Sequence, residues 1–290
     1  MEIIRTIEWM KQIAHDARAK EHVLGLIPTM GALHEGHVSL VRAAKQDCSP
    51  VVASIFVNPM QFGPGEDLQK YPRTFERDAA ALENLGVNYL FAPEASEMYP
   101  GGFRTSVSVE GLSDRLEGRS RPGHFRGVTT VVLKLFEIVQ PQRAYFGRKD
   151  AQQLRIIRQM AADLNLDTQI ITCPIIREPD GLAMSSRNAY LQGDARRAAT
   201  VLYRALVSAK KEIEAGQIEA ARLVEIMRQV FEKEPNAALD YAEIVDADTL
   251  EPVLRLRKTC LALVAAFVGK TRLIDNALIE DCDDAISVIL

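Results

Sequence analysis

Two histidines stand close together near the start of the chain, in the segment His34–His37. A short apolar run at 23–27 precedes them, and apolar residues at helical spacing follow them from 38 to 44. Residues 28–37 therefore join a predicted strand to the start of a predicted helix. Backbone amides at a helix N-terminus bind phosphate, and glycines at 31 and 36 permit close approach of the backbone to a ligand.

His34 and His37 could instead be metal ligands, because two histidines three residues apart can share a helix face. The zinc motif HExxH, however, places its histidines four residues apart. No third ligand is evident in the sequence, so we favour histidines that donate hydrogen bonds to polyphosphate oxygens. We expect no metal site built from protein ligands.

A second polar cluster, 147–153, follows another short apolar run. Its Lys149 can reach phosphate oxygens as a mobile point charge. The alternative is structural, because Asp150 with Gln153 three residues later resembles a capping box. Taken alone, the cluster favours this capping interpretation.

A third cluster, 183–188, reads Ala-Met-Ser-Ser-Arg-Asn. Its two hydroxyls and its guanidinium can bind a polyphosphate. The same residues would also suit a solvated linker. The cluster alone leaves both interpretations open.

These clusters need a scaffold, and the first 187 residues alternate between predicted strands and predicted helices. Such alternation is typical of an α/β fold with an open, parallel, Rossmann-like sheet, which binds ligands at the carboxyl ends of its strands. We predict strands at 23–27, 51–57, 87–92, 143–146 and 169–176, and helices at about 37–44, 75–85, 128–139 and 151–164.

The pattern changes after Asn188. Two helical stretches, 194–215 and 218–234, are followed by apolar strand-like segments, the last two joined tightly through Gly269-Lys270. Helices followed by strands indicate an α+β domain. We therefore predict a Rossmann-like domain at 1–187 and a smaller C-terminal α+β domain at 188–290, whose strands lie at 239–245, 260–268 and 271–279.

Composition excludes several classes of protein. The chain has 290 residues, 47% hydrophobic and 26% charged, which is an ordinary globular balance rather than that of a disordered protein. A net charge of −4 disfavours nucleic acid as a partner, and no apolar run reaches the length of a membrane span. The N-terminus lacks a signal-peptide layout, so we expect a cytoplasmic protein. The four cysteines are scattered, and we expect buried, reduced thiols at Cys48, Cys173, Cys260 and Cys282.

The first and third clusters together resemble the HIGH and KMSKS signatures of class I aminoacyl-tRNA synthetases and related nucleotidylyltransferases. More narrowly, five blocks resemble the pantoate–β-alanine ligase (pantothenate synthetase) family. They are, in order, PTMGALHEGHVSL, IFVNPMQFGPGEDLQKYPRT, RPGHFRGVTTVV, YFGRKDAQQL and AMSSRN. Ala183 stands where the synthetase signature begins with lysine, which weakens a tRNA synthetase interpretation.

The resemblance implies an ATP-dependent condensation of (R)-pantoate with β-alanine to pantothenate. Pantoate would attack the α-phosphate of ATP and release pyrophosphate, and β-alanine would then displace AMP from the pantoyl adenylate. Mg²⁺ is implied because a carboxylate that attacks ATP needs the phosphate charge neutralised. A homodimer is implied as well.

The resemblance also implies roles for individual residues. His34, His37 and Lys149 would stabilise charge on the phosphates, and Gln61, Gln153 and Asn58 would bind pantoate or β-alanine. Arg121 and His124 are weaker assignments near the substrate, and Asp78 is a conceivable outer metal ligand that we rank below a helix-surface role. The implied ATP-binding residues are Met30, Gly31, Ala32, Leu33, His34, Glu35, Gly36, His37, Gly147, Arg148, Lys149, Asp150, Ile176 through its backbone, Met184, Ser185, Ser186 and Arg187.

Two alternatives stay open. One is an adenylyl transferase of the same superfamily that acts on another small acid. The other is a non-catalytic nucleotide-binding or RNA-binding module, for which a basic stripe or a long anticodon-binding extension would be the sign. The sequence shows neither feature.

Overall fold

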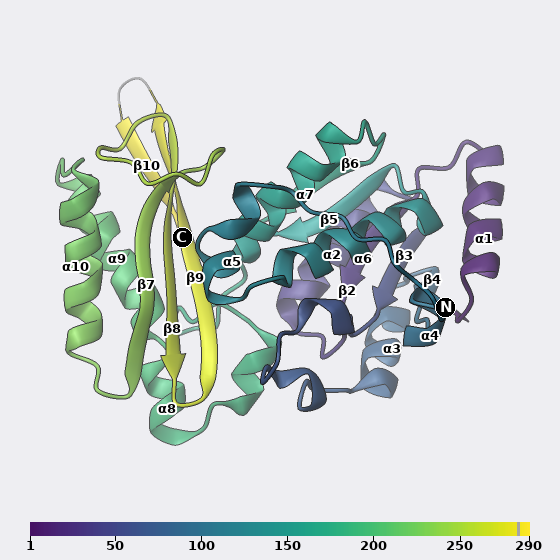
Figure 1. Ribbon diagram of the computed structural model, residues 1–290, viewed down its shortest axis with the longest axis horizontal. Coiled ribbons are helices and arrows are strands. Elements are labelled where there is room, and N and C mark those ends of the chain that lie inside the picture. The colour runs from purple at the N-terminus through teal and green to yellow at the C-terminus, as the bar shows by residue number, and fades with distance from the viewer. Residues whose placement is uncertain (283–284) are drawn as a thin grey trace. The chain divides into compact units, whose positions relative to one another are not determined.

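A computed structural model describes residues 1–282 and 285–290 of the chain (Figure 1). Contacts between residues divide it into two compact units. The first unit comprises Met1–Arg148 and Gln152–Pro174, and the second comprises Lys149–Ala151 and Ile175–Leu290. We predicted residues 175–187 to lie in the first domain, but by their contacts they belong to the second unit.

The first unit contains a six-stranded parallel sheet in the order β1-β4-β3-β2-β5-β6 (Figure 1). The predicted α/β class and the Rossmann-like parallel sheet are confirmed. The edge strand β1, which we did not predict, pairs with β4. The strands are β1 Glu2–Ile4, β2 Gly25–Thr29, β3 Val51–Ile55, β4 Tyr89–Phe91, β5 Arg143–Gly147 and β6 Gln169–Cys173.

Helices cover both faces of this sheet. Helices α1, α6 and α7 share one apolar core with Leu26 of β2, whereas α2 and α3 share another core with the next residue, Ile27. Successive side chains of a strand point to opposite faces, so one apolar strand serves both layers. The helices are α1 Ile7–Ala19, α2 Glu35–Asp47, α3 Phe75–Asn84, α4 Ala95–Met98, α5 Glu117–Ser120, α6 His124–Val139 and α7 Ala151–Asp163, and the 3-10 turns are η1 Pro59–Gln61, η2 Asp67–Gln69 and η3 Leu112–Asp114.

The strand order reverses direction at β2. The chain leaves β2 through α2 and enters β3 on one side, whereas β5 lies on the other side of β2. In open α/β sheets, ligands bind at the carboxyl ends of the strands where the order reverses. In this sheet those ends are the segment after Thr29 and the segment after Gly147.

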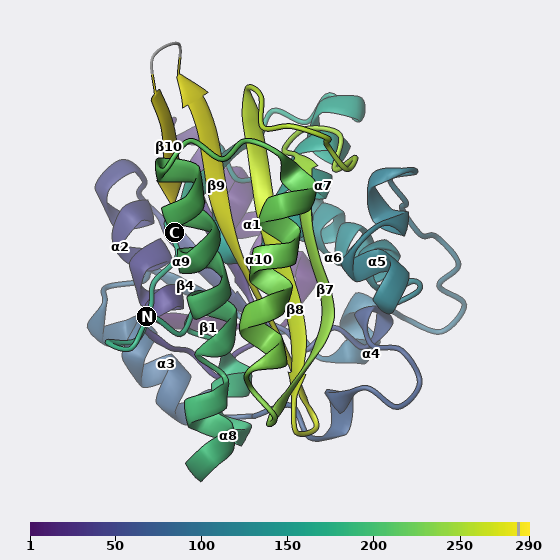
Figure 2. The ribbon, with the colours of Figure 1, turned by 90° about the vertical axis from the view of Figure 1, so that its left-hand side faces the viewer.

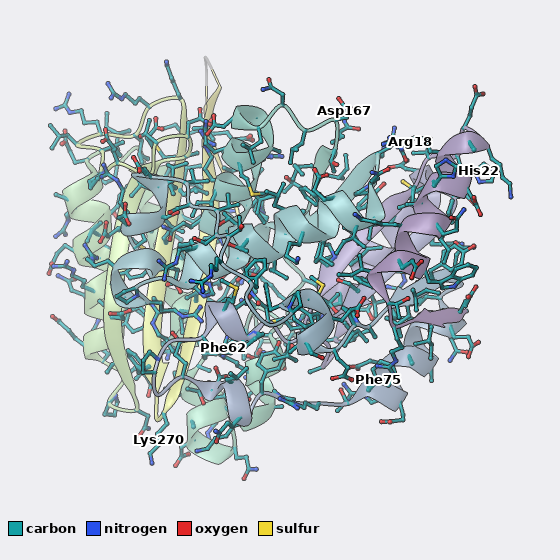
Figure 3. All side chains as sticks on the ribbon, turned by 45° about the vertical axis from the view of Figure 1, so that its right-hand side comes forward. Arg18, His22, Phe62, Phe75, Asp167 and Lys270 are labelled. Carbon is teal, nitrogen blue, oxygen red and sulfur yellow. The ribbon has the colours of Figure 1, made fainter. Side chains whose placement is uncertain are left out.

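The second unit has four antiparallel strands in the order β10-β9-β8-β7. Helices α9 and α10 pack on one face of this sheet (Figure 2), and Lys270 lies at the turn between β8 and β9 (Figure 3). The predicted α+β character and this hairpin are confirmed. The 3-10 turn η4 Arg148–Asp150 begins in the first unit with Arg148 and ends in the second. The other elements are η5 Ser186–Tyr190, α8 Gly193–Ala198, α9 Val201–Glu214, α10 Ala220–Glu232, β7 Ala237–Asp246, β8 Thr259–Val268, β9 Thr271–Cys282 and β10 Ala285–Ile289.

Three of the four cysteines, Cys48, Cys173 and Cys260, are buried free thiols, as predicted. The side chain of Cys282 lies outside the described residues. Among the helices of residues 1–282 and 285–290, none combines the length and the apolar character needed to cross a bilayer.

Candidate active site

The loop between β2 and α2 takes a conformation that few sequences allow. Gly31 and Ala32 both have positive φ, 82° and 51°. The hydroxyl of Thr29 accepts a hydrogen bond from the Gly31 amide over 3.1 Å and donates one to the carbonyl of Ser54 over 2.7 Å. The loop is therefore tied to β3 at the carboxyl edge of the sheet.

Asp78 fixes the rest of this loop. Its Oδ2 accepts from the amide of Ala32 over 2.7 Å and from the hydroxyl of Thr74 over 2.9 Å, and its Oδ1 accepts from the amide of Leu33 over 3.0 Å. The side chain is only 1% exposed. Our expectation of a helix-surface role for Asp78 was therefore wrong, because α3 turns this carboxylate inward to hold the loop.

His34 and His37 form the N-terminal cap of α2. Nδ1 of His34 accepts a hydrogen bond from the amide of Gly36 over 3.1 Å, and Nδ1 of His37 accepts from the amide of His34 over 3.4 Å. A ring nitrogen that accepts carries no proton, so each neutral imidazole holds its proton on Nε2. The ring centroids lie 4.1 Å apart, so the two imidazoles are neighbours at the positive end of a helix.

Gln61 and Asn58 lie in the η1 segment, which packs tightly against α6. A Cβ atom on Gly127 of α6 would lie 2.3 Å from the carbonyl oxygen of Met60, so only glycine permits this approach. The side chain of Gln61 is buried, and its Nε2 lies 3.2 Å from Sδ of Met30 in the β2–α2 loop. Two predicted site segments, one around Met30 and one around Gln61, are thereby in contact.

Arg121 and His124 lie close to Gln61. Nδ1 of His124 donates to the carbonyl of Gln61 over 2.8 Å, and Nη1 of Arg121 lies 3.1 Å from Nε2 of His124. Burial and then the charge of Arg121 lower the pKa of His124 to about 4. His124 is buried, and Arg121 is half-buried in a salt bridge of 2.6 Å with Glu66.

Lys149 and Asp150 belong to the second unit, whereas Gly147 and Arg148 belong to the first. Nζ of Lys149 lies 3.5 Å from Oδ1 of Asp150. The carbonyl of Lys149 accepts a hydrogen bond of 2.8 Å from Nδ2 of Asn276 in β9. Sequence reasoning missed Asn276, which is more than a hundred residues away in the chain.

Residues 176–184 form a short hairpin in the second unit. The carbonyl of Ile176 accepts from the amide of Met184 over 2.9 Å, and Arg177 pairs with Ala183 across an isolated bridge. Ala183 is buried, so the position where a synthetase signature has lysine is part of the core here. After the hairpin, Oγ of Ser185 accepts from the amide of Arg187 over 3.2 Å and caps η5.

Two adjacent glutamines at the start of α7 have different environments. Gln152 is buried, accepts from the amide of Glu117 and donates to the carbonyls of Leu112 and Arg115. Gln153, the predicted ligand, is half-buried. Gln152 therefore holds the α5 segment, and sequence reasoning offered no signal that separated the two residues.

A metal site was not expected. Within the part of the chain that the structure describes, no three His, Cys, Asp or Glu side chains are placed to hold a metal ion.

Comparisons with known proteins identify the family of this chain. The family Pantoate-beta-alanine ligase matches residues 2–278. The pantothenate synthetase of Koribacter versatilis is 53% identical over 285 residues, 98% of each chain. That of Thermotoga neapolitana is 53% identical over 279 residues, 96% of this chain and 100% of that protein. The chain belongs to the pantoate–β-alanine ligase family.

Solved structures agree with this membership. The crystal structure of pantothenate synthetase from Thermus thermophilus matches with a TM-score of 0.90 at 46% identity, covering 95% of this chain and 98% of that one. The pantoate–β-alanine ligase of Francisella tularensis, complexed with beta-gamma ATP and β-alanine, matches with a TM-score of 0.79 at 36% identity, covering 95% and 97%. The resemblance found in five sequence blocks is confirmed, and a non-catalytic RNA-binding module is excluded.

Proposed function

We propose that this chain catalyses the reaction of its family in two steps at the carboxyl edge of the parallel sheet. Pantoate first attacks the α-phosphate of ATP, which gives pantoyl adenylate and pyrophosphate. β-Alanine then displaces AMP to give pantothenate. The observation that carries this proposal is the cap of α2, where Nδ1 of His34 and Nδ1 of His37 each accept a backbone amide, so that the ring proton of each histidine is on Nε2.

The loop 30–37 is the proposed phosphate-binding segment of the first unit. Negative charge moves onto the bridging and leaving oxygens as the bond between the α- and β-phosphates breaks. Preorganised N–H donors stabilise such charge without reorganisation, and loss of one typically costs about 10²- to 10³-fold in rate. Asp78 holds the loop in this conformation.

Further ATP contacts are proposed for Gly147 and Arg148 in the first unit and for segments 149–150, 176 and 184–187 in the second. Lys149 supplies a mobile positive charge for the phosphates. This charge would do what the lysine of the synthetase signature does, since this chain has Ala183 at that position. Ser185, Ser186 and Arg187 supply hydroxyls and a guanidinium that can bind phosphate oxygens.

Gln61 and Gln153 are the proposed pantoate-binding residues. A buried amide can form hydrogen bonds with hydroxyl and carboxylate oxygens. A ligand without these oxygens would leave the amide unpaired, and the free-energy cost of the unpaired amide makes binding specific. Asn58 is only 1% exposed and makes hydrogen bonds with protein groups at both ends of its amide. We therefore assign Asn58 to the support of Gln61 rather than to contact with the substrate.

Mg²⁺ is proposed to arrive with ATP. Magnesium in nucleotide sites is held largely by phosphates and water, with few protein ligands. Asp78 does not suit a metal, because both of its oxygens accept hydrogen bonds from the protein. When bound, Mg²⁺ supplies charge neutralisation on the phosphates, which complements the N–H donors of the histidines.

A homodimer and a cytoplasmic location are also proposed. The membership of the family supports the dimer, and the consumption of ATP supports the location. Light scattering at micromolar concentrations tests the first, and cell fractionation tests the second. A monomeric mass, or activity only in an exported fraction, would contradict the respective proposal.

The function itself is tested by omission of single substrates. AMP release should require pantoate, β-alanine and ATP together, whereas exchange of labelled pyrophosphate into ATP should require pantoate but not β-alanine. The rival adenylyl transferase would show the exchange with another small acid and not with pantoate.

A further inference from the structure

Gln61 is held by a chain of hydrogen bonds that begins at Tyr99. Oη of Tyr99 donates to Oδ1 of Asn58 over 2.8 Å, and Nδ2 of Asn58 donates to Oε1 of Gln61 over 3.1 Å. Nε2 of Gln61 then points to Sδ of Met30, at 3.2 Å. The chain joins the end of α4 to the β2–α2 loop through η1.

The direction of this chain is fixed at its first two members. Burial raises the pKa of Tyr99 well above its usual value, so its hydroxyl stays a donor. Oδ1 of Asn58 also accepts from the amide of Met60, and Nδ2 also donates to the carbonyl of Gly127 over 3.0 Å. If the Asn58 amide were flipped, its NH₂ group would face the donors of Tyr99 and Met60, and its oxygen would face the carbonyl of Gly127. Several hydrogen bonds would then be lost.

The orientation of Asn58 in turn fixes that of Gln61. Because Asn58 presents an N–H to Gln61, the oxygen of the Gln61 amide faces inward and its nitrogen faces the β2–α2 loop. A primary amide has two N–H groups, and Sδ of Met30, a weak acceptor, takes one of them. The Gln61 side chain is thereby oriented as a donor.

We propose that Tyr99 is a positioning residue for substrate recognition, which acts through Asn58 to present the Gln61 amide nitrogen to an oxygen of pantoate. This inference rests on the proposed function of Gln61 as a pantoate-binding residue. It adds a residue that lies 38 positions further along the chain than Gln61 and reaches Gln61 through Asn58.

Tyr99→Phe removes one hydroxyl and keeps the aromatic packing. The Tyr99 ring lies against Phe103, with centroids 5.1 Å apart, and against Phe56, with centroids 6.1 Å apart. These contacts do not involve the hydroxyl, so the variant should fold. Tyr145→Phe is the matched control, because the Tyr145 hydroxyl is also buried and bonded, to Cys48, but is not part of the chain to Gln61.

Steady-state kinetics with purified full-length enzyme tests the proposal. We expect Tyr99→Phe to raise the KM for pantoate about five- to tenfold, as loss of one orienting hydrogen bond does, with kcat and the KM for ATP within about twofold of wild type. Tyr145→Phe should leave all three constants unchanged. A KM for pantoate in Tyr99→Phe equal to that of wild type would overturn the proposal.

A double-mutant cycle tests whether Tyr99 acts through Gln61. In a Gln61→Ala background, Tyr99→Phe should cause no further rise in the KM for pantoate, because the group that it orients is gone. Additive effects would mean that Tyr99 acts by another route, and would overturn the proposal. Failure of the proposed function would look different, because the wild-type enzyme would then form no pantothenate.

Discussion

The imidazole of His124 donates a hydrogen bond from Nδ1 to the backbone carbonyl of Gln61 over 2.8 Å. Arg121 lies on the other side of the ring, where its N–H groups meet an unprotonated Nε2 at 3.1 Å. Protonation of Nε2 would place two donors and two positive charges face to face. The fold therefore requires a neutral His124, and this requirement links stability to pH.

The stability of the first unit should fall as the pH decreases from about 6.5 to about 4. The pKa of His124 is lowered to about 4 in the fold, so in this interval the unfolded chain binds a proton that the folded chain does not. The loss should approach about 3 kcal/mol, since one pKa unit corresponds to about 1.4 kcal/mol. Glu66 and Glu117 oppose the loss, because their charges raise the pKa of His124.

Denaturant unfolding measured across this pH range tests the linkage. His124→Asn, which does not titrate, should flatten the dependence of the unfolding free energy on pH. His15→Asn is the control, because His15 is exposed and its change should leave the dependence as in wild type. An unaltered slope in His124→Asn would assign the acid sensitivity to other groups.

Asp78→Asn should weaken ATP binding more than pantoate binding. The amide offers one acceptor oxygen where the carboxylate offers two, so one of the amides of Ala32 and Leu33 loses its partner. A buried donor left unpaired costs about 1–3 kcal/mol, so ATP affinity should fall roughly tenfold. Glu76→Gln makes the same isosteric change at an exposed position of the same helical turn, and calorimetry should show normal ATP binding.

Gln152→Ala and Gln153→Ala should separate stability from substrate binding. Gln152→Ala removes three hydrogen bonds to 112–117, so the melting temperature should drop by roughly 4–8 °C. Gln153→Ala should instead raise the KM for pantoate with little change in melting temperature. Both are measured by thermal scans and kinetics on the same samples. If Gln152→Ala raised the KM for pantoate and Gln153→Ala lowered the melting temperature, Gln152 would be the substrate ligand.

The sequence was enough to predict the parallel sheet, because each central strand of the sheet is apolar on both faces and is followed by apolar residues at helical spacing. It did not reveal β1, which has only three residues and gains its place by pairing with β4. It also predicted a single helix at 194–215, where the structure has α8 and α9, because the helical composition continues through Ala199 and Thr200.

Local sequence was enough to place the segment His34–His37 at the start of a helix, which the structure confirms. Local sequence did not indicate the contacts of Asp78, Tyr99 and Asn276, because each of these residues forms a hydrogen bond with a residue more than forty positions away. The burial of Asp78 follows from which turn of α3 faces the β2–α2 loop, and sequence periodicity does not encode that relationship.

His37→Ala should slow the formation of pyrophosphate by roughly 10² or more, as loss of one preorganised donor does. The same change also removes the acceptor that holds the amide of His34. Two further variants separate these effects. His37→Asn can place Oδ1 where Nδ1 accepts but lacks a donor at Nε2, whereas His37→Gln can place an N–H near Nε2 but loses the cap.

If the donor matters, His37→Asn should be as slow as His37→Ala in adenylation, and His37→Gln should recover part of the rate. With pantoyl adenylate supplied ready-made, all three variants should transfer the acyl group to β-alanine close to the wild-type rate, because the departing AMP needs less new charge stabilisation. Rapid-quench measurement of each half-reaction distinguishes the cases. An equal loss in both half-reactions, rescued by His37→Asn, would show that His37 mainly holds the loop, and wild-type adenylation in His37→Ala would remove it from the mechanism.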